Sequence, residues 1–473
     1  MPHDPDRQHP NITLAVLALG CLAFSLLQSL VAPALPAIQH ELHTSESGVT
    51  WILTGYLLSA SVATPLLGRL GDIHGKEHVL VWVLVALGAG ALVSALASSL
   101  TVMIIGRVIQ GAGGGVFPLA FGIIRDEFPR ERVAGSIGLI SAILGIGGGA
   151  GIVLAGVLVD NLSYHWLFWL PLVAVAIAAV ATALYIPESP VRAPGKIAWS
   201  SAALLSAGLA ALMLSVSEAP TWGWESGRTL GLALVGLLIL AAWVRNELHI
   251  PSPLVDMRVM RLRGVWTTNL VAFLVGMGMY NSFILLPQLV ELPKSTGFGF
   301  GASVTGAGLF MIPLTVMMLI VGPLAGRLER SFGSRPPLIA GCLFTAAAYI
   351  LLGAGHDQRP LVYIASALLG IGIGLAFAAM ANLIVQAVPP EQTGVATAVN
   401  TIARTVGGAL GSQVVASILA GIVAANGLPQ ERAFTLSFAL TAGALLVSAL
   451  AALAIPGRPT PEVERVAPEA EVA

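Results

Sequence analysis

Long apolar stretches alternate with short polar segments along nearly the whole chain. A helix of about 20 apolar residues spans the hydrocarbon core of a bilayer, and stretches of that length occur again and again. The pattern therefore predicts an all-α integral membrane protein with fourteen spanning helices. These cover residues 12–33, 48–67, 79–98, 101–124, 133–159, 164–186, 198–217, 228–247, 265–288, 302–325, 337–355, 360–386, 393–422 and 432–454.

A glycine-rich, charged sequence, PLLGRLGDIHGK, follows the second apolar stretch, and a related sequence follows the tenth. Five of its residues recur 258 positions later: Pro65, Gly68, Arg69, Leu70 and Gly75. Glycines further on, such as Gly147 and Gly407, recur at an offset of 260. We interpret this as two homologous halves. The offset exceeds six helices by the length of two more, which indicates a 6+2+6 arrangement.

These patterns divide the chain into five parts. We expect an N-terminal tail at 1–11, a six-helix bundle at 12–190, two linker helices at 191–250, a second six-helix bundle at 251–455 and a C-terminal tail at 456–473. The last tail is rich in proline and glutamate, a composition typical of disorder.

Basic residues are distributed unevenly between the two sets of loops. With the N-terminus placed inside, 17 of the 23 lysines and arginines fall on the inner side. The outer side has only Arg228, Lys294, Arg359 and Arg432. The positive-inside rule therefore predicts that both termini are cytoplasmic, in the cytoplasmic membrane of a bacterium.

Composition supports the membrane class and excludes several others. Hydrophobic residues make up 56% of the chain and charged residues 10%, against about a quarter charged in soluble domains. Cys21 and Cys342 lie in apolar stretches, which argues against a disulfide framework or a zinc site. We expect no metal, no cofactor and no nucleic-acid partner, and we expect a monomer in the lipid bilayer.

The first copy of the repeated sequence holds five residues that we expect to act together: Gly68, Arg69, Asp72, Gly75 and Lys76. The glycines would let the chain turn tightly and let helices two and eleven (48–67 and 337–355) approach closely. Asp72 would accept hydrogen bonds from the N-terminus of a neighbouring helix in one conformation only, as a latch on an outward-open state. The alternative is an ordinary loop with cytoplasmic positive charge.

Glycine runs also occur inside the fourth and fifth predicted helices, at 111–115 and 145–151. No Lys-Ser or Lys-Thr follows them, so they are not phosphate-binding loops. Small residues one helical turn apart are typical of close helix packing. We expect Gly147, Gly151 and Gly156 to pack the fifth helix against its neighbours.

Several polar side chains lie within the predicted helices and could face a central cavity. They are Gln28, Arg107, Gln110, Tyr280, Asn281, Asn400 and Arg404. A guanidinium in a membrane needs partners, and we expect Arg107 to pair with Gln28 or with backbone carbonyls. For each of the others, structural packing is the competing interpretation. No aspartate or glutamate falls at mid-membrane, which leaves Asp160 and Glu291, at outer helix ends, as candidate proton carriers; a surface cap is the alternative for Asp160.

The motifs resemble those of a known family. The signature between helices two and three is matched by Gly68, Leu70, Gly71, Asp72, Gly75 and Lys76, and that of helix four by Arg107, Gln110, Gly111 and Gly115. Over nearly its whole length the chain resembles the fourteen-helix drug:proton antiporters of the major facilitator superfamily. Two positions depart from the pattern, because Leu27 replaces the usual helix-one aspartate and Ile152 the usual helix-five proline.

The resemblance implies a secondary transporter that exports hydrophobic small molecules by alternating access, coupled to protons, with its site between the halves. Uptake through the same fold, with a non-cationic substrate, remains an alternative. A membrane enzyme would need paired carboxylates or histidine clusters, and we expect none. Because Leu27 supplies no charge while Arg107 and Arg404 are positive, we expect neutral or anionic substrates rather than cations.

Overall fold

The computed structural model describes residues 10–189, 191–193, 197–251 and 253–456. Within these ranges the regular structure is helical apart from one isolated bridge between Val423 and Pro429. Fourteen helical segments are long and apolar enough to cross a membrane. The prediction of an all-α fold with fourteen spanning helices is confirmed.

The α-helices are numbered in chain order. They are α1 (Pro10–Ser29), α2 (Val31–Glu41), α3 (Glu46–His74), α4 (Lys76–Ala95), α5 (Leu100–Gln110), α6 (Val116–Glu127), α7 (Arg130–Asn161), α8 (Trp166–Tyr185), α9 (Trp199–Trp222), α10 (Gly227–Glu247), α11 (Met257–Met260), α12 (Arg263–Glu291), α13 (Val304–Phe332), α14 (Arg335–Gly355), α15 (Arg359–Ala387), α16 (Thr393–Gly421) and α17 (Glu431–Ala452).

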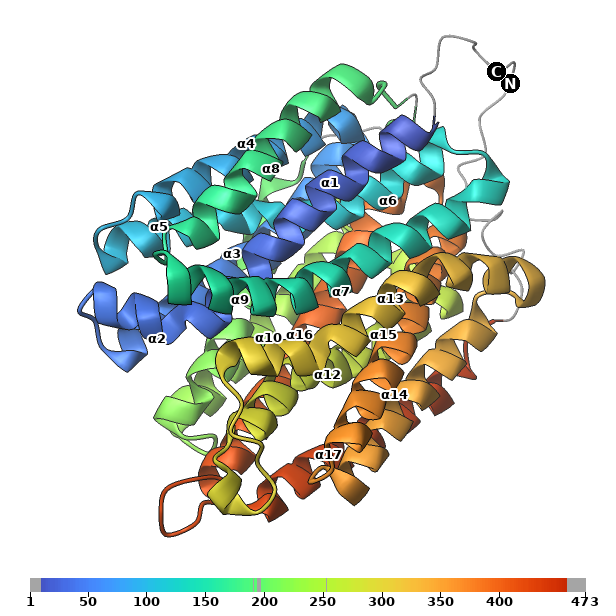
Figure 1. The fold of residues 1–473 in the computed structure, drawn as a ribbon. Helices are drawn as coiled ribbons and strands as arrows, with labels where there is room; N and C mark the ends of the chain where they lie inside the picture. Colours follow the sequence, from blue (N-terminus) through green and yellow to red (C-terminus); the bar gives the residue numbers. More distant parts are fainter. Residues whose placement is uncertain (1–9, 190, 194–196, 252, 457–473) are drawn as a thin grey trace, which may run out of the picture.

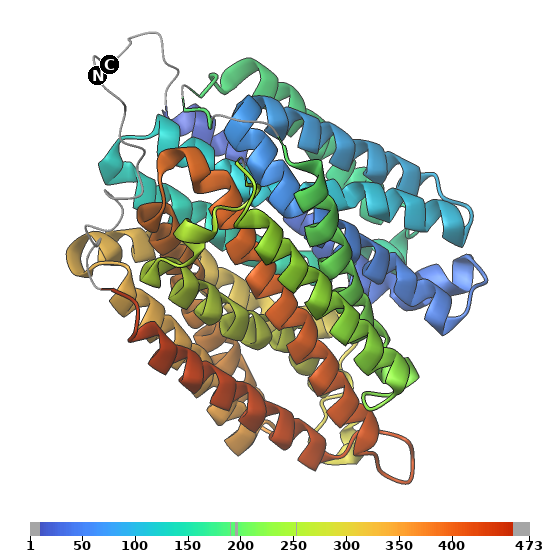
Figure 2. The same cartoon turned by 180° about the vertical axis from the view of Figure 1, so that it is seen from behind.

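The helices form two groups that lie side by side (Figure 1). Most buried apolar residues fall into two clusters, one built from α1 to α8 and the other mainly from α12 to α17. The linker helices α9 and α10 pack on each other, and α9 contacts both α3 and α16 on the face seen in Figure 2. The linker therefore contacts both groups. The residue limits given above for the two bundles stay a prediction.

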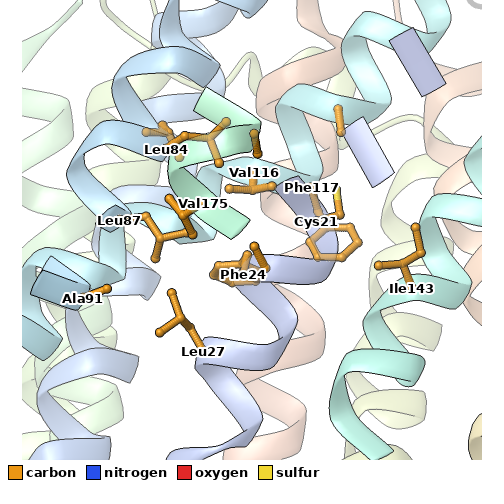
Figure 3. Packing of buried hydrophobic residues seen from close by; sticks show 14 of the residues in the cluster. Cys21, Phe24, Leu27, Leu84, Leu87, Ala91, Val116, Phe117, Ile143 and Val175 are labelled. Carbon is orange, nitrogen blue, oxygen red and sulfur yellow. The ribbon is translucent and has the colours of Figure 1, made fainter. Parts of the chain in front are cut away.

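Phe24 of α1 lies within the first cluster, close to residues of α4 and α6 (Figure 3). Phe24 lies edge-on to Phe117 of α6, with ring centroids 5.9 Å apart. Figure 3 shows Leu27 of α1 on the side of the cluster where Leu87 and Ala91 of α4 also lie. Since lipid tails are as apolar as these side chains, van der Waals contact rather than the hydrophobic effect holds such helices together.

The repeated sequence is helical almost to its end, so the prediction of a turn from Pro65 to Lys76 is wrong. Helix α3 continues through Pro65 to His74, and only Gly75 turns, with φ 103°. The second copy behaves alike, because α13 runs to Phe332 before Gly333 at φ 78°. A positive φ suits glycine, which has no Cβ. The charged residues suggested a loop, but Asp72 can lie within a helix because its hydrogen-bond partners belong to another helix.

The fourth span is not one regular α-helix. A 3₁₀ segment, η1 (Gly111–Gly115), separates α5 from α6. A Cβ added at Gly111 would lie 1.9 Å from the Ser59 hydroxyl oxygen, and one at Gly114 would lie 2.2 Å from that of Thr64. The glycines thus let this span lie directly against α3. The first span also divides, into α1 and α2, at Leu30.

Candidate functional site

The carboxylate of Asp72 joins the two halves at one end of the bundle, which we call the signature end because the Gly75 and Gly333 turns lie there. Its Oδ1 accepts a hydrogen bond from the Gly394 amide (3.0 Å) and its Oδ2 one from the Val395 amide (2.9 Å). Asp72 is fully buried. These amides open α16, whose helix N-terminus carries partial positive charge, so the contact combines two charge-assisted bonds with a favourable dipole.

The helix that meets α3 here is the thirteenth span, α16, so the prediction of helix eleven is wrong. A Cβ added at Gly68 would lie 2.7 Å from the Gly394 carbonyl oxygen, and one at Gly394 would lie 2.6 Å from that of Gly68. Paired glycines let the backbones touch. The sequence repeat reveals the glycines but not which helix they face.

Lys76 and Arg125 extend this contact. The Lys76 ammonium lies 2.7 Å from Asp126 Oδ2 and 3.7 Å from Asp72 Oδ1, all of them buried. Arg125 donates across the halves to the Thr393 hydroxyl (2.6 Å) and the Val388 carbonyl (2.8 Å). Sequence reasoning missed Arg125 and Asp126. Their one signal in the sequence was that the end of the fourth predicted helix lies at the same end of the bundle as Lys76.

Arg69, the remaining member of the predicted latch, lies on α3 and is 8% exposed. Its Nε has no hydrogen-bond partner among the described residues. The structure thus places Gly68, Asp72, Gly75 and Lys76 in one contact region, with Arg69 on the same helix end.

Helix α7 has glycines on two faces. A Cβ at Gly147 or Gly151 would collide with Ser25 or Ser29 of α1, in the same half. The Ser29 hydroxyl also donates to the Gly147 carbonyl (2.6 Å). The other face meets α13 of the opposite half, where a Cβ at Gly156 would lie 2.8 Å from the Thr305 hydroxyl oxygen. One helix therefore packs both within and between the halves.

A cavity of about 50 Å³ lies between the two groups of helices. Its walls are Phe24, Gln28, Tyr56, Leu57, Ala60, Ser61, Thr64, Gly114, Phe117, Leu144, Tyr280, Thr401, Ile402, Arg404 and Thr405. One water needs about 10–15 Å³, whereas sites for drug-sized ligands measure about 300 Å³ or more. In this conformation the cavity has room for a few waters only, and the halves must separate before it admits a larger molecule.

Four of the predicted cavity residues lie where they were expected. Gln28, Tyr280 and Arg404 line the central cavity, and Asn400 lines a smaller adjoining one together with Arg404. Asn400 also donates to Asn269 of α12 (3.0 Å).

Three others lie elsewhere, which corrects the prediction. Arg107 donates to Gln110 Oε1 (2.7 Å) and to the backbone carbonyls of Ile52 and Leu27 (both 3.3 Å). Of its two predicted kinds of partner it therefore has the backbone carbonyls and not Gln28. Its guanidinium lies over the Tyr56 ring, 4.3 Å from the centroid, and Arg107 is not among the residues that line the cavity. Asn281 is buried and donates to Thr441 of α17 (2.9 Å). Arg107, Gln110 and Asn281, which the sequence pattern placed at the cavity, are therefore packed inside the bundles.

The two candidate proton carriers, Asp160 and Glu291, stay a prediction. Glu291 is exposed at the end of α12, and the side chain of Asp160 lies outside the described residues. Glu77, His78 and Glu188 could place three ligand atoms within 4.8 Å of one another. Arg192 already pairs with Glu188, and we assign no metal there.

The sequence matches the model of the Major Facilitator Superfamily over residues 17–412. The tetracenomycin C resistance and export protein of Streptomyces glaucescens is 30% identical over 401 residues, which cover 82% of this chain and 72% of that protein. The multidrug transporter protein MdtP of Bacillus subtilis (strain 168) is 27% identical over 397 residues, covering 83% and 72%.

Two solved structures share the fold. The human organic anion transporter MFSD10 has a TM-score of 0.67 at 18% identity, covering 94% of this chain and all of that one. The proton:xylose symporter XylE has a TM-score of 0.68 at 15% identity, covering 96% and 98%. At these identities the likeness concerns the fold alone.

Proposed function

The chain belongs to the Major Facilitator Superfamily, and from that premise we propose that it exports hydrophobic small molecules across the cytoplasmic membrane of a bacterium by alternating access. The family assignment makes it a transporter and not an enzyme. Export is supported by one relative that is named for tetracenomycin C resistance and export and by another that is named a multidrug transporter.

The observation that carries the proposal is the small cavity between the halves, together with the contact that joins the halves at the signature end. Asp72 accepts from two α16 amides and Arg125 from the first half donates to Thr393, so separation of the halves at the signature end must break all three bonds. Alternating access requires such contacts to form and break in every cycle. The predicted latch is therefore proposed as a device of transport.

Accumulation in cells tests the direction. Cells that express the protein, or its Asp72→Asn variant, would be loaded with Nile red (neutral), fluorescein (anionic) or rhodamine 6G (cationic). Export predicts lower steady accumulation of at least one dye with the unaltered protein than with the variant. Higher accumulation would instead indicate uptake, the alternative function.

Proton coupling is the finer part of the proposal. In proteoliposomes, an imposed pH gradient should drive transport of the same dye, and an uncoupler should abolish it. Asp160→Asn and Glu291→Gln test the two candidate carriers. If neither substitution alters the response to the pH gradient, protons use another group.

Orientation follows from the positive-inside rule, with the signature end and both termini in the cytoplasm. Both native cysteines are buried, so a single new thiol reports its own accessibility. A membrane-impermeant maleimide should label Thr221→Cys on intact cells and leave Arg192→Cys unlabelled. Labelling of Arg192→Cys from outside would reverse the assignment.

A further inference from the structure

Arg404 presents an uncompensated positive charge to the central cavity. It lines both cavities, and its guanidinium carbon lies 4.4 Å from the centroid of the Phe377 ring. Within the part of the chain that the structure describes, Arg404 makes no hydrogen bond and no ion pair. The contact with Phe377 contributes about 0.5–2 kcal/mol, which is less than the cost of an unpaired ion inside a membrane protein.

The lining of the two cavities supplies no counter-charge. Among its described residues there is no aspartate or glutamate. A buried cation is stable when an anion lies against it, and costs several kcal/mol when none does. The missing negative charge must therefore come from a molecule that enters the cavity.

Two further side chains of the same cavity offer hydrogen-bond donors without partners. Neither the Gln28 amide nor the Tyr280 hydroxyl forms a hydrogen bond with any described residue, although both line the cavity. By contrast, the Thr401 and Thr405 hydroxyls already donate to backbone carbonyls one turn earlier. Arg404, Gln28 and Tyr280 thus come from three helices, α16, α1 and α12, and offer donors to one space.

The remaining walls are apolar and aromatic. Phe24 and Phe117 line the central cavity, and Phe121 and Phe377 line the adjoining one. Leu144, which lines both, occupies the position of the first half that corresponds to Arg404 at the repeat offset of 260. The lining is therefore mostly apolar and aromatic, with Arg404 as its one charged residue among those described.

We propose that the central cavity binds aromatic organic anions, with a carboxylate or phenolate paired to Arg404 and the rings against the phenylalanines. Tyr280 and Gln28 donate to the same anionic group, which fixes its orientation. The inference rests on the proposed function, because it takes the cavity to be the transport site. It adds the substrate class, and it removes Arg107 from substrate contact.

Binding to the purified full-length protein tests this inference without reference to transport. The probes are 2-naphthoate, its uncharged methyl ester and the 2-naphthyltrimethylammonium cation, titrated by isothermal calorimetry in nanodiscs in gluconate buffer. We expect the anion to bind at least tenfold more tightly than the ester, with no measurable binding of the cation. Equal affinity for anion and ester would overturn the proposal.

Substitutions locate the anion. Arg404→Gln should weaken naphthoate binding at least tenfold and change ester binding less than twofold, while Arg404→Lys retains part of the affinity. Arg261→Gln, at an exposed arginine, is the matched control and should change neither. Leu144→Glu places a carboxylate in the lining of both cavities and should reverse the preference toward the cation. Unchanged naphthoate affinity in both Arg404→Gln and Leu144→Glu would refute the assignment.

Chloride is the other source of negative charge. If chloride fills the site instead, adding chloride should abolish naphthoate binding at millimolar concentration, and this outcome would overturn an organic-anion site. The two proposals can fail separately. Naphthoate binding without dye export would support the anion site and contradict the export function. Dye export without a preference for the anion would support export and contradict the anion site.

Discussion

Arg107 in the first half and Arg404 in the second half both lie inside spanning helices, and the two side chains have opposite surroundings. Arg107 in the first half is fully buried, donates three hydrogen bonds to its own bundle and lies on Tyr56; only its Nη2 lacks a partner. Arg404 in the second half lines the cavity and lies over the Phe377 ring, and it has no hydrogen bond or ion pair among the described residues. A cation that its own bundle surrounds serves the fold, whereas a cation left open to a cavity is suited to a ligand.

The sharpest test of this comparison is stability. Arg107→Ala removes three hydrogen bonds, strands the Gln110 oxygen and leaves a void, so we expect the free energy of unfolding to fall by about 3 kcal/mol. Because an unpaired buried charge costs several kcal/mol, Arg404→Ala should raise the free energy of unfolding or leave it unchanged. Reversible unfolding in detergent by sodium dodecyl sulfate measures both. Equal losses would remove the distinction.

The sequence predicted the fold well because the bilayer fixes one length. A spanning helix needs about 20 apolar residues, and this requirement alone yields the count of fourteen. Helix contacts could not be predicted in the same way, since positions facing lipid and positions facing protein are both apolar. On α4, for example, Leu92 is 40% exposed and Leu87 is fully buried, although both are leucines.

The candidate site was predicted in part for a related reason. Successive residues of a helix point about 100° apart, so Tyr280 reaches the cavity while its neighbour Asn281 bonds to α17. In the sequence, Arg107 and Arg404 are both isolated charges in apolar helices, so the sequence does not show that only one of them lines the cavity. Leu27, the position of the missing acid, packs in the α1 and α4 cluster and does not line the cavity (Figure 3). A carboxylate there would be buried in the core, so Leu144→Glu is the better way to offer a cation a partner.

The two copies of the repeated sequence differ in the same manner as the arginines. In the first, Asp72 is fully buried and accepts two amide hydrogen bonds across the halves. Its counterpart 258 positions later is Arg330, which is exposed and donates one bond of 3.2 Å to the Glu131 carbonyl of α7. Both residues link the halves, but only the Asp72 contact is buried away from solvent.

This difference predicts unequal effects on turnover. Asp72→Asn keeps the size but leaves one α16 amide facing an NH₂ group, and a bond to a charged group is worth about 1.5–3 kcal/mol. We expect the initial rate of dye transport, per inserted protein, to fall at least tenfold. Arg330→Gln, at an exposed site, should change the rate less than twofold. Comparable losses in both variants would show that the two copies act alike.

The smallest contrast lies within one helix, between the two glycine faces of α7. A Cβ at Gly147 would lie 2.1 Å from Ser25 Cβ, inside the first half, whereas one at Gly138 would lie 2.3 Å from the Gly322 carbonyl oxygen of α13, in the other half. Gly147→Ala should therefore cost about 1–2 kcal/mol of stability through overpacking. It should leave transport per folded molecule nearly unchanged.

Gly138→Ala should act on the cycle instead of the fold. The α13 backbone cannot yield within the packed half, so the halves must move apart near the signature end, which favours the conformation open on that side. We expect the free energy of unfolding to change by less than about 1 kcal/mol. A thiol introduced by Ala134→Cys, one helical turn away, should react with maleimide several-fold faster in the Gly138→Ala protein than in the protein without that substitution. Gly147→Ala is the control, since its collision lies inside one half and should leave that rate unaltered. Faster labelling in both backgrounds would mean that α7 responds as a whole, and that its two faces do not separate stability from transport.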